Sequence, residues 1–145
     1  PEAVNFFIFV SRFEYALKRA GYLKDRKKND QAGADWVCFA RDLGKDFFDE
    51  CLEAKEARLL IEAPPKHQIA LEDRLGWRAA GEVTNIQDLI GAVCRVRNNL
   101  FHGGKFPEGP VEEVGRNAAL LRCALWILDA ALAKNPKVKS FFTDI

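Results

Sequence analysis

The sequence predicts an all-α protein, an antiparallel bundle of four to five helices with a long irregular connection before its most informative helix. Three observations favour this class. Apolar residues recur every three or four positions over several stretches, no useful stretch alternates like a half-buried strand, and glycine, proline or capping residues separate the stretches. The 145 residues suit a single domain over residues 1–145, and 48% hydrophobic with 30% charged residues is typical of a globular chain.

The first two expected helices carry most of the aromatic residues. The first covers residues 4–23 and frays at Gly21, with a stripe of Phe6, Val10, Phe13, Leu17 and Ala20 that Phe7 and Ile8 widen. Because these aromatics share the stripe with Val and Leu, we interpret them as core or dimer interface rather than as a base-stacking platform. Asp35 is the expected N-cap of the second helix, which has Trp36, Phe39, Leu43, Phe47 and Cys51 on one side and is weakened by Gly44.

The middle of the chain is less regular. A third helical stretch over residues 53–62 ends at Pro64 and Pro65, because proline cannot continue a helix. Residues 66–81 have no clean period, so we expect a loop with at most one short helix, anchored on the core by Trp77. His67 in this loop has no partner at metal-ligand spacing and is interpreted as solvated.

The last two expected helices flank the motif. Asn85 is the expected cap of a helix with Ile86, Leu89, Ile90, Val93 and Leu100 on one side, stopped by Gly103 and Gly104. The final long helix starts at Pro110 and ends near Lys134, before Asn135 and Pro136.

Charge and cysteine content narrow the function classes. A net charge of +1 argues against binding nucleic acid by whole-surface electrostatics, so any RNA contact must be local. The four cysteines form no CxxC, so we expect free thiols in a reducing cytoplasm, without a metal or cofactor. No apolar stretch is long enough to span a bilayer, so no membrane partner is expected. Whether residues precede Pro1 in the native protein stays open.

The informative segment, residues 96–104, reads VRNNLFHGG. A helical wheel places Arg97 near the middle of the apolar stripe and Arg95 on the opposite side, so Arg95 is expected to be ordinary surface. A guanidinium that faces a core or interface is costly unless it has an anionic partner or lines a polar cleft, because it cannot lose its proton. Arg97 is therefore a candidate functional residue.

Two polar neighbours complete the candidate site. His102 lies at the end of the same helix, where the carbonyl ends favour an imidazolium, and this suits proton exchange near neutral pH. Asn98 shares its face four residues earlier and can position the ring or a phosphate oxygen. Arg97 and His102 do not share a face of an ideal helix, so they must converge through the long Arg side chain and unwinding at Gly103.

Glu14 is the expected supporting residue, because it lies on the broad apolar face of the first helix. It can neutralise Arg97, or it can form a surface pair with Lys18 worth a few tenths of a kcal/mol. The spacing leaves both interpretations open, with the surface pair slightly favoured.

Arg-Asn-x-x-x-His-Gly at the end of an amphipathic helix, followed by a loop and one more long helix, resembles the RxxxxH motif of the HEPN superfamily (higher eukaryotes and prokaryotes nucleotide-binding). The resemblance covers residues 97–102 as a motif and most of the chain as a helix pattern. It implies an HEPN-like helical domain that dimerises and brings two copies of the motif to one cleft.

The resemblance also implies an activity: a metal-independent endoribonuclease that leaves a 2′,3′-cyclic phosphate, often a toxin or phage-defence effector. His102 would be the general acid or base at the ribose 2′-hydroxyl, Arg97 would hold the scissile phosphate, and Asn98 would assist. The implied partners are an RNA substrate, a second copy, and an antitoxin or larger defence complex.

Two alternatives stay open. Some members of the superfamily have lost the activity, so one alternative is a non-catalytic module that binds a nucleotide or a partner protein. In the other, His102 closes the helix and a paired Arg97 holds two helices together. The RNA target and base preference are not predicted.

Overall fold

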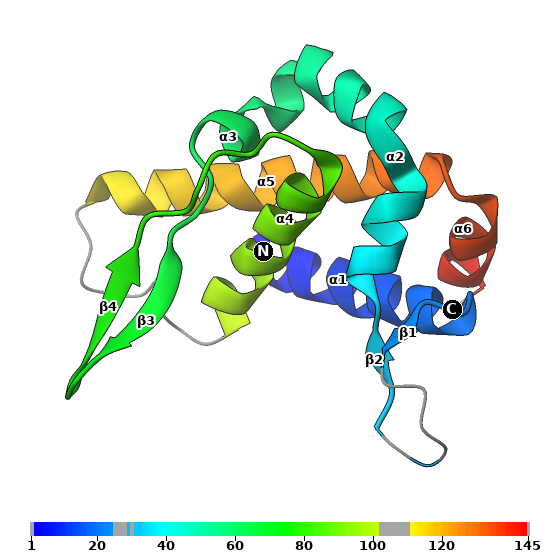
Figure 1. The fold of residues 1–145 in the computed structure, drawn as a ribbon, viewed down its shortest axis with the longest axis horizontal. Helices are drawn as coiled ribbons and strands as arrows, with labels where there is room; N and C mark the ends of the chain where they lie inside the picture. The colour runs from blue at the N-terminus through cyan, green and yellow to red at the C-terminus, as the bar shows by residue number, and fades with distance from the viewer. Residues whose placement is uncertain (1, 25–28, 30, 102–110, 145) are drawn as a thin grey trace.

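The computed structural model describes residues 2–24, 29, 31–101 and 111–144 and is mainly helical (Figure 1). The helical elements are α1 (Glu2–Arg19), α2 (Trp36–Glu53), the 3-10 turn η1 (Lys55–Ala57), α3 (Arg58–Glu62), α4 (Ile86–Phe101), α5 (Val111–Ala133) and α6 (Pro136–Thr143). The strands form two antiparallel pairs, β1 (Leu23–Lys24) with β2 (Gly33–Ala34) and β3 (His67–Leu71) with β4 (Arg74–Arg78). The mainly helical class is therefore confirmed.

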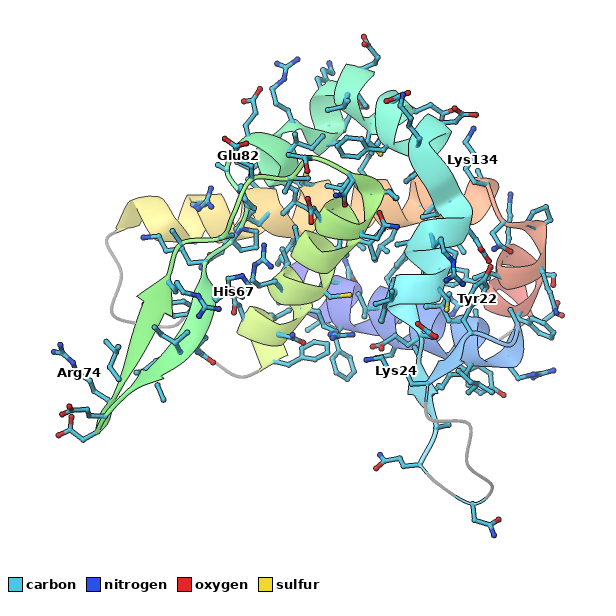
Figure 2. All side chains as sticks on the ribbon, in the orientation of Figure 1. Tyr22, Lys24, His67, Arg74, Glu82 and Lys134 are labelled. Atoms are coloured by element: carbon cyan, nitrogen blue, oxygen red, sulfur yellow. The ribbon has the colours of Figure 1, made fainter. Side chains whose placement is uncertain are left out.

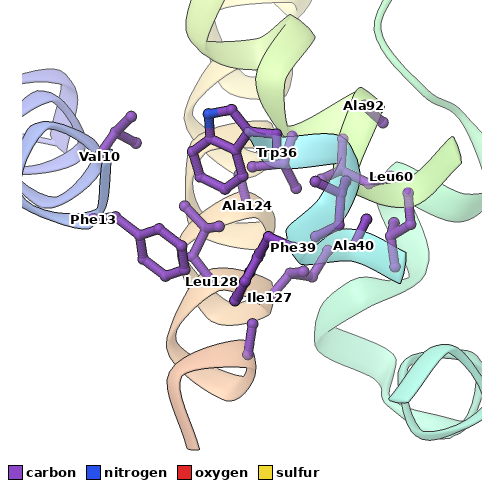
Figure 3. Close-up of a cluster of buried hydrophobic side chains, with 14 of the residues drawn as sticks. Val10, Phe13, Trp36, Phe39, Ala40, Leu60, Ala92, Ala124, Ile127 and Leu128 are labelled. Carbon is purple, nitrogen blue, oxygen red and sulfur yellow. The ribbon is translucent and has the colours of Figure 1, made fainter. Parts of the chain in front are cut away.

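Helix α5 forms the centre of the core and contacts each of the other α-helices. It buries apolar side chains around much of its circumference, as expected of a helix surrounded by others: Leu120, Leu121, Cys123, Ala124, Ile127, Leu128, Ala131 and Leu132. In Figure 1, α2 and α4 cross in front of α1 and α5. Figure 3 shows Phe13, Phe39 and Leu128 meeting in this core.

The predicted stripes of α1 and α2 lie in the core. All five stripe residues, four on α1 and Ala20 directly after it, are buried, whereas Phe7 and Ile8 are exposed. Phe13 stacks on Trp36 with ring centroids 5.2 Å apart, and this contact joins the two helices. Gly44 interrupts α2 with φ of 74° and ψ of −177°, so the expected weak point is a kink.

The two predicted N-caps are confirmed. Asp35 Oδ1 accepts a hydrogen bond of 3.0 Å from the Cys38 amide at the start of α2, and this bond lowers the pKa of Asp35. Asn85 Oδ1 accepts one of 2.8 Å from the Asp88 amide at the start of α4. The expected stop signals at Gly103 and Gly104, and Pro110, lie outside the described residues.

The expectation of a loop over residues 66–81 is wrong, because β3 and β4, each of five residues, form a hairpin that projects from the helical body (Figure 1). Its two-residue turn is Glu72 and Asp73, with φ of 44° at Glu72, instead of the Asn-Gly that signals such a turn. Trp77 is 38% exposed on this hairpin and does not bury itself in the core as expected. Gly76 is buried there, because the Leu71 side chain covers it and would clash with a Cβ.

Helix α6 was not predicted. Asn135 and Pro136, interpreted as the stop of the preceding helix, also start the next one: Asn135 Oδ1 accepts from the Val138 amide at 3.0 Å, and proline suits the first helical turn. Helix α6 packs on α1, where the Phe9 and Phe142 ring centroids lie 4.9 Å apart.

Candidate functional site

Arg97 lies near the C-terminal end of α4, on the side that approaches α1. Helix α4 buries Ile86, Leu89, Ile90, Val93 and Val96, which fixes its rotation against the core. The Arg97 side chain is 19% exposed, so it lies at the edge of the core, whereas the helical wheel placed it near the middle of the apolar stripe. A guanidinium in this position is expected to have an anionic partner or to line a polar cleft.

Glu14 is that partner. Its Oε2 lies 3.0 Å from Arg97 Nη1 and also accepts a hydrogen bond of 3.1 Å from Trp36 Nε1. The structure therefore pairs Glu14 with Arg97, and the slightly favoured surface pair with Lys18 is not the arrangement observed. Because both carboxylate contacts are partly buried, Glu14 joins α1, α2 and α4 at one point.

The other edge of the Arg97 guanidinium faces Asn98. The Asn98 Oδ1 accepts from Arg97 Nε at 3.1 Å and from Nη2 at 2.9 Å, and both bonds are solvent-exposed. These two nitrogens form the edge that binds a phosphate or carboxylate in bidentate fashion. A neutral amide oxygen occupies this edge, so an incoming anion would replace a weaker acceptor.

A half-buried cysteine, Cys94, lies one turn before Arg97. Burial raises the pKa of Cys94 to about 11, against the opposing effect of the Arg97 charge. The thiol is thus neutral near pH 7, and Glu14 supplies the negative charge beside Arg97.

His102 lies outside the described residues. Its convergence with Arg97 and its place relative to Asn98 therefore stay predictions. The structure brings together three of the four predicted site residues: Glu14, Arg97 and Asn98.

An exposed apolar cluster adjoins these residues. It consists of Val4, Phe7, Ile8 and Phe101, which are 56%, 53%, 50% and 42% exposed. Phe7 and Phe101 bring α1 and the end of α4 together, with ring centroids 5.2 Å apart. Phe101 follows Arg97 by one helical turn, so the cluster and the guanidinium share one end of α4.

Two residues on the other side of α4 were missed by the sequence analysis. Arg95 is partly buried rather than ordinary surface: its Nε donates to the Pro65 carbonyl at 2.6 Å, and desolvation lowers the pKa of the guanidinium. Asn99, 3% exposed, donates from Nδ2 to the Lys66 carbonyl at 3.1 Å. Both hold the segment that leads into β3, and nothing in the local sequence reveals that this segment covers α4.

His67 is also placed differently from the expectation. It is half-buried at the base of the β3–β4 hairpin, beside α4, and lines a polar cavity with Arg95 (Figure 2). Desolvation, followed by the charges of Arg95 and Arg78, lowers the pKa of His67, so the ring is neutral near pH 7.

Cys38, Cys51, Cys94 and Cys123 are free thiols. In the described part of the chain, no group of three or more His, Cys, Asp or Glu side chains is arranged to hold a metal ion. None of the described helices combines the length and apolar character needed to cross a membrane.

Comparison with models of known protein families, with curated proteins and with solved structures found no match to this chain.

Proposed function

We propose that this chain is a metal-independent endoribonuclease with an HEPN-like helical fold, acting as a homodimer with a composite active site. The observation that carries the proposal is the Arg97 guanidinium. Glu14 fixes the partly buried side of the guanidinium through Nη1. The solvent-exposed edge, Nε and Nη2, donates to the Asn98 amide oxygen, which a phosphate could replace as the acceptor. A guanidinium held in this way is preorganised to bind a phosphodiester and the charge that develops on it.

The proposed reaction needs a base and an acid beside that phosphate. His102 would take the proton of the ribose 2′-hydroxyl, whose oxygen attacks the phosphorus. The bond to the 5′-oxygen breaks, and that oxygen leaves with a proton from an imidazolium, the partner subunit's His102 or the same ring after exchange. The products are a 2′,3′-cyclic phosphate and a 5′-hydroxyl, and Arg97 would stabilise the added negative charge on the phosphate oxygens.

A second copy is the occupant that we propose for the exposed apolar cluster of Val4, Phe7, Ile8 and Phe101. Four large apolar side chains that are each about half exposed favour burial against another surface. Because the cluster adjoins Arg97, a two-fold contact there would bring two guanidiniums and two RNxxxH segments to one groove.

The setting that we propose follows from the resemblance and the sequence. Cytoplasmic toxin or phage-defence activity, restrained by an antitoxin or a larger complex, suits a nuclease that needs no cofactor. The site needs only the RNA substrate and the second subunit.

Cleavage of labelled RNA in EDTA tests the proposal. Wild type should cleave and leave a 2′,3′-cyclic phosphate, and a 2′-deoxy substitution at the cleaved position should block the reaction because it removes the nucleophile. His102→Ala should lower the rate by about 100-fold or more. Arg97→Lys should also lower it strongly, because lysine keeps the charge but loses the bidentate edge.

Arg41→Lys is the matched control, since Arg41 is exposed on α2, and it should cleave like wild type. Thermal melts of every variant separate loss of chemistry from loss of fold. Full activity of folded His102→Ala would refute this mechanism.

The ion pair with Glu14 favours one competing function, a non-catalytic module in which Arg97 ties α1 to α4. In that case wild type would not cleave RNA under any condition, and Arg97→Lys would change thermal stability alone. Dimerisation without cleavage, together with nucleotide affinity, would favour a binding module.

A further inference from the structure

A polar cavity of about 230 Å³ lies on the side of α4 away from Arg97. Its walls come from α4, from the start of β3, and from the chain that joins β4 to α4. The polar lining residues are His67, Glu82, Gln87, Asp88 and Arg95. Figure 2 shows His67 at the base of the hairpin beside α4, and Glu82 on the chain leading into α4.

Gly91 keeps this cavity open. It lies in the middle of α4, where glycine is an unfavourable residue, and a Cβ built there would meet no atom within 4 Å. Asp88 lies three residues before Gly91 and Arg95 lies four residues after it, so all three residues share one face of the helix. A larger side chain at position 91 would lie between the two charges.

The two charges are positioned but do not pair with each other. Asp88 Oδ2 accepts from the Thr84 amide and from Thr84 Oγ1, each at 3.1 Å, while Arg95 Nε donates to Pro65 O at 2.6 Å. No ion pair joins Asp88 to Arg95 in the described part of the chain. Among the described residues, Arg95 Nη1 and Nη2 have no hydrogen-bond acceptor, so they are available to a ligand.

The lining determines the charge of the ligand. An anion would meet the carboxylates of Glu82 and Asp88, and a cation would meet the Arg95 guanidinium. A ligand without net charge that carries N–H donors on one edge and acceptors on another satisfies both sides. Guanine is such a ligand: its N1–H and 2-amino group suit a carboxylate, and its O6 and N7 suit a guanidinium.

We propose that this cavity is a guanine-binding pocket, in which Asp88 and Glu82 face the donor edge and Arg95 the acceptor edge of the base. The half-buried His67 ring, neutral near pH 7, forms one wall and adds no charge that would repel an uncharged base. The cavity has room for one base rather than a base pair, which suits a free nucleoside or an unpaired base in RNA. Guanine binding by this pocket does not depend on RNA cleavage. Selection of the cleavage position by the pocket does, and it rests on the proposed nuclease function.

Calorimetric titration of the full chain with single nucleosides tests the pocket. Guanosine should bind, adenosine, cytidine and uridine should not, and inosine, which lacks the 2-amino group, should bind about tenfold or more weakly. Gly91→Leu should abolish guanosine binding because its side chain enters the cavity. Asp88→Asn should weaken it about tenfold or more, because an amide replaces the carboxylate.

Gly115→Leu is the matched control. Gly115 is also an exposed helical glycine whose Cβ would meet no atom within 4 Å, but it lies on α5 and does not line the cavity. This variant should bind guanosine like wild type. Equal affinity for guanosine and adenosine, or unchanged guanosine binding by Gly91→Leu, would overturn the proposal.

RNA strands containing a single guanine distinguish the two sources of the base. If the pocket reads RNA, cleavage should fall at a constant offset from the guanine in wild type and lose that position in Gly91→Leu. Guanosine binding without any cleavage would keep the pocket and refute the nuclease. RNA cleavage without guanosine binding would refute the pocket and keep the nuclease.

Discussion

Arg95 and Arg97 lie two residues apart on α4, but their side chains have different environments. Arg97 faces α1, where a carboxylate 3.0 Å away balances its charge. Arg95 faces the start of β3, where a backbone carbonyl at 2.6 Å satisfies one nitrogen. Within residues 2–24, 29, 31–101 and 111–144, no carboxylate forms an ion pair with Arg95. The first arrangement links helices, whereas the second holds a cation in a polar cavity that Asp88 and Glu82 also line.

The difference separates two uses of a partly buried guanidinium. A paired guanidinium contributes to stability and has a fixed orientation, and it can bind an anion only through an edge that its partner leaves exposed. A guanidinium in a polar cavity that forms no direct ion pair with a described carboxylate interacts more strongly with a ligand, because no such pair has to be broken first. Removing the partner on each side tests this contrast.

The largest effect is expected on the Arg97 side. Glu14→Ala removes the carboxylate from Arg97 and the acceptor from Trp36 Nε1, so it should lower the free energy of unfolding by about 2 kcal/mol. The estimate lies between values for surface and buried pairs because both side chains are partly exposed. Urea denaturation followed by tryptophan fluorescence measures it.

Glu14→Gln is the companion variant. Its amide oxygen can still accept from Trp36, so the loss should be about half as large. A double-mutant cycle with Arg97→Ala should give a coupling of about 1 kcal/mol. Zero coupling would mean that the ion pair does not stabilise the chain.

A smaller effect is expected on the Arg95 side. Arg95→Ala removes the hydrogen bond to the Pro65 carbonyl and should lower the free energy of unfolding by about 1 kcal/mol. Hydrogen exchange should rise most in β3 and β4, because this bond and that of Asn99 to Lys66 hold the chain entering the hairpin. Arg74→Ala, at the exposed turn end of β4, is the control and should have little effect. Equal exchange in both variants would contradict the anchoring role.

The two arginines also show which parts of the site could be predicted from the sequence. The 3.6-residue period correctly predicted that Arg97 faces the other helices, because this direction depends on residues of the same helix, although Arg97 lies at the edge of the apolar stripe and not near its middle. Arg95 was wrongly interpreted as ordinary surface, because its cover comes from residues about thirty positions earlier. A helical wheel describes one helix and does not include what packs on its polar side.

The same limit explains the errors in the fold. The stripe of α1 and the caps Asp35 and Asn85 are local and were confirmed. The β3–β4 hairpin was missed because its turn, Glu72 and Asp73, lacks the usual residues and its strands show little alternation. Helix α6 was missed because Asn135 and Pro136 are compatible with both a helix end and a helix start.

The smallest effect concerns pH on the Arg95 side. Desolvation, Arg95 and Arg78 lower the pKa of His67 below its ordinary value of 6.5, while Glu82 and Asp88 line the same cavity. The unfolded chain therefore takes up a proton at a higher pH than the folded chain. His67 thus destabilises the fold as pH falls from 7 through 6.5, and this penalty is absent above that range.

His67→Gln removes the titrating ring and keeps a polar side chain of similar size. Urea denaturation across this pH range should show a shallower loss of stability in the variant than in wild type, because the unfolded state no longer gains the proton. The two should converge above pH 7, where the ring is neutral in both states. Parallel curves would show that the ring has the same proton affinity in the folded and unfolded chain, and would place it in water rather than against Arg95. A lowered pKa of His67 is expected in this cavity, because desolvation disfavours the imidazolium and the Arg95 guanidinium adds to that effect.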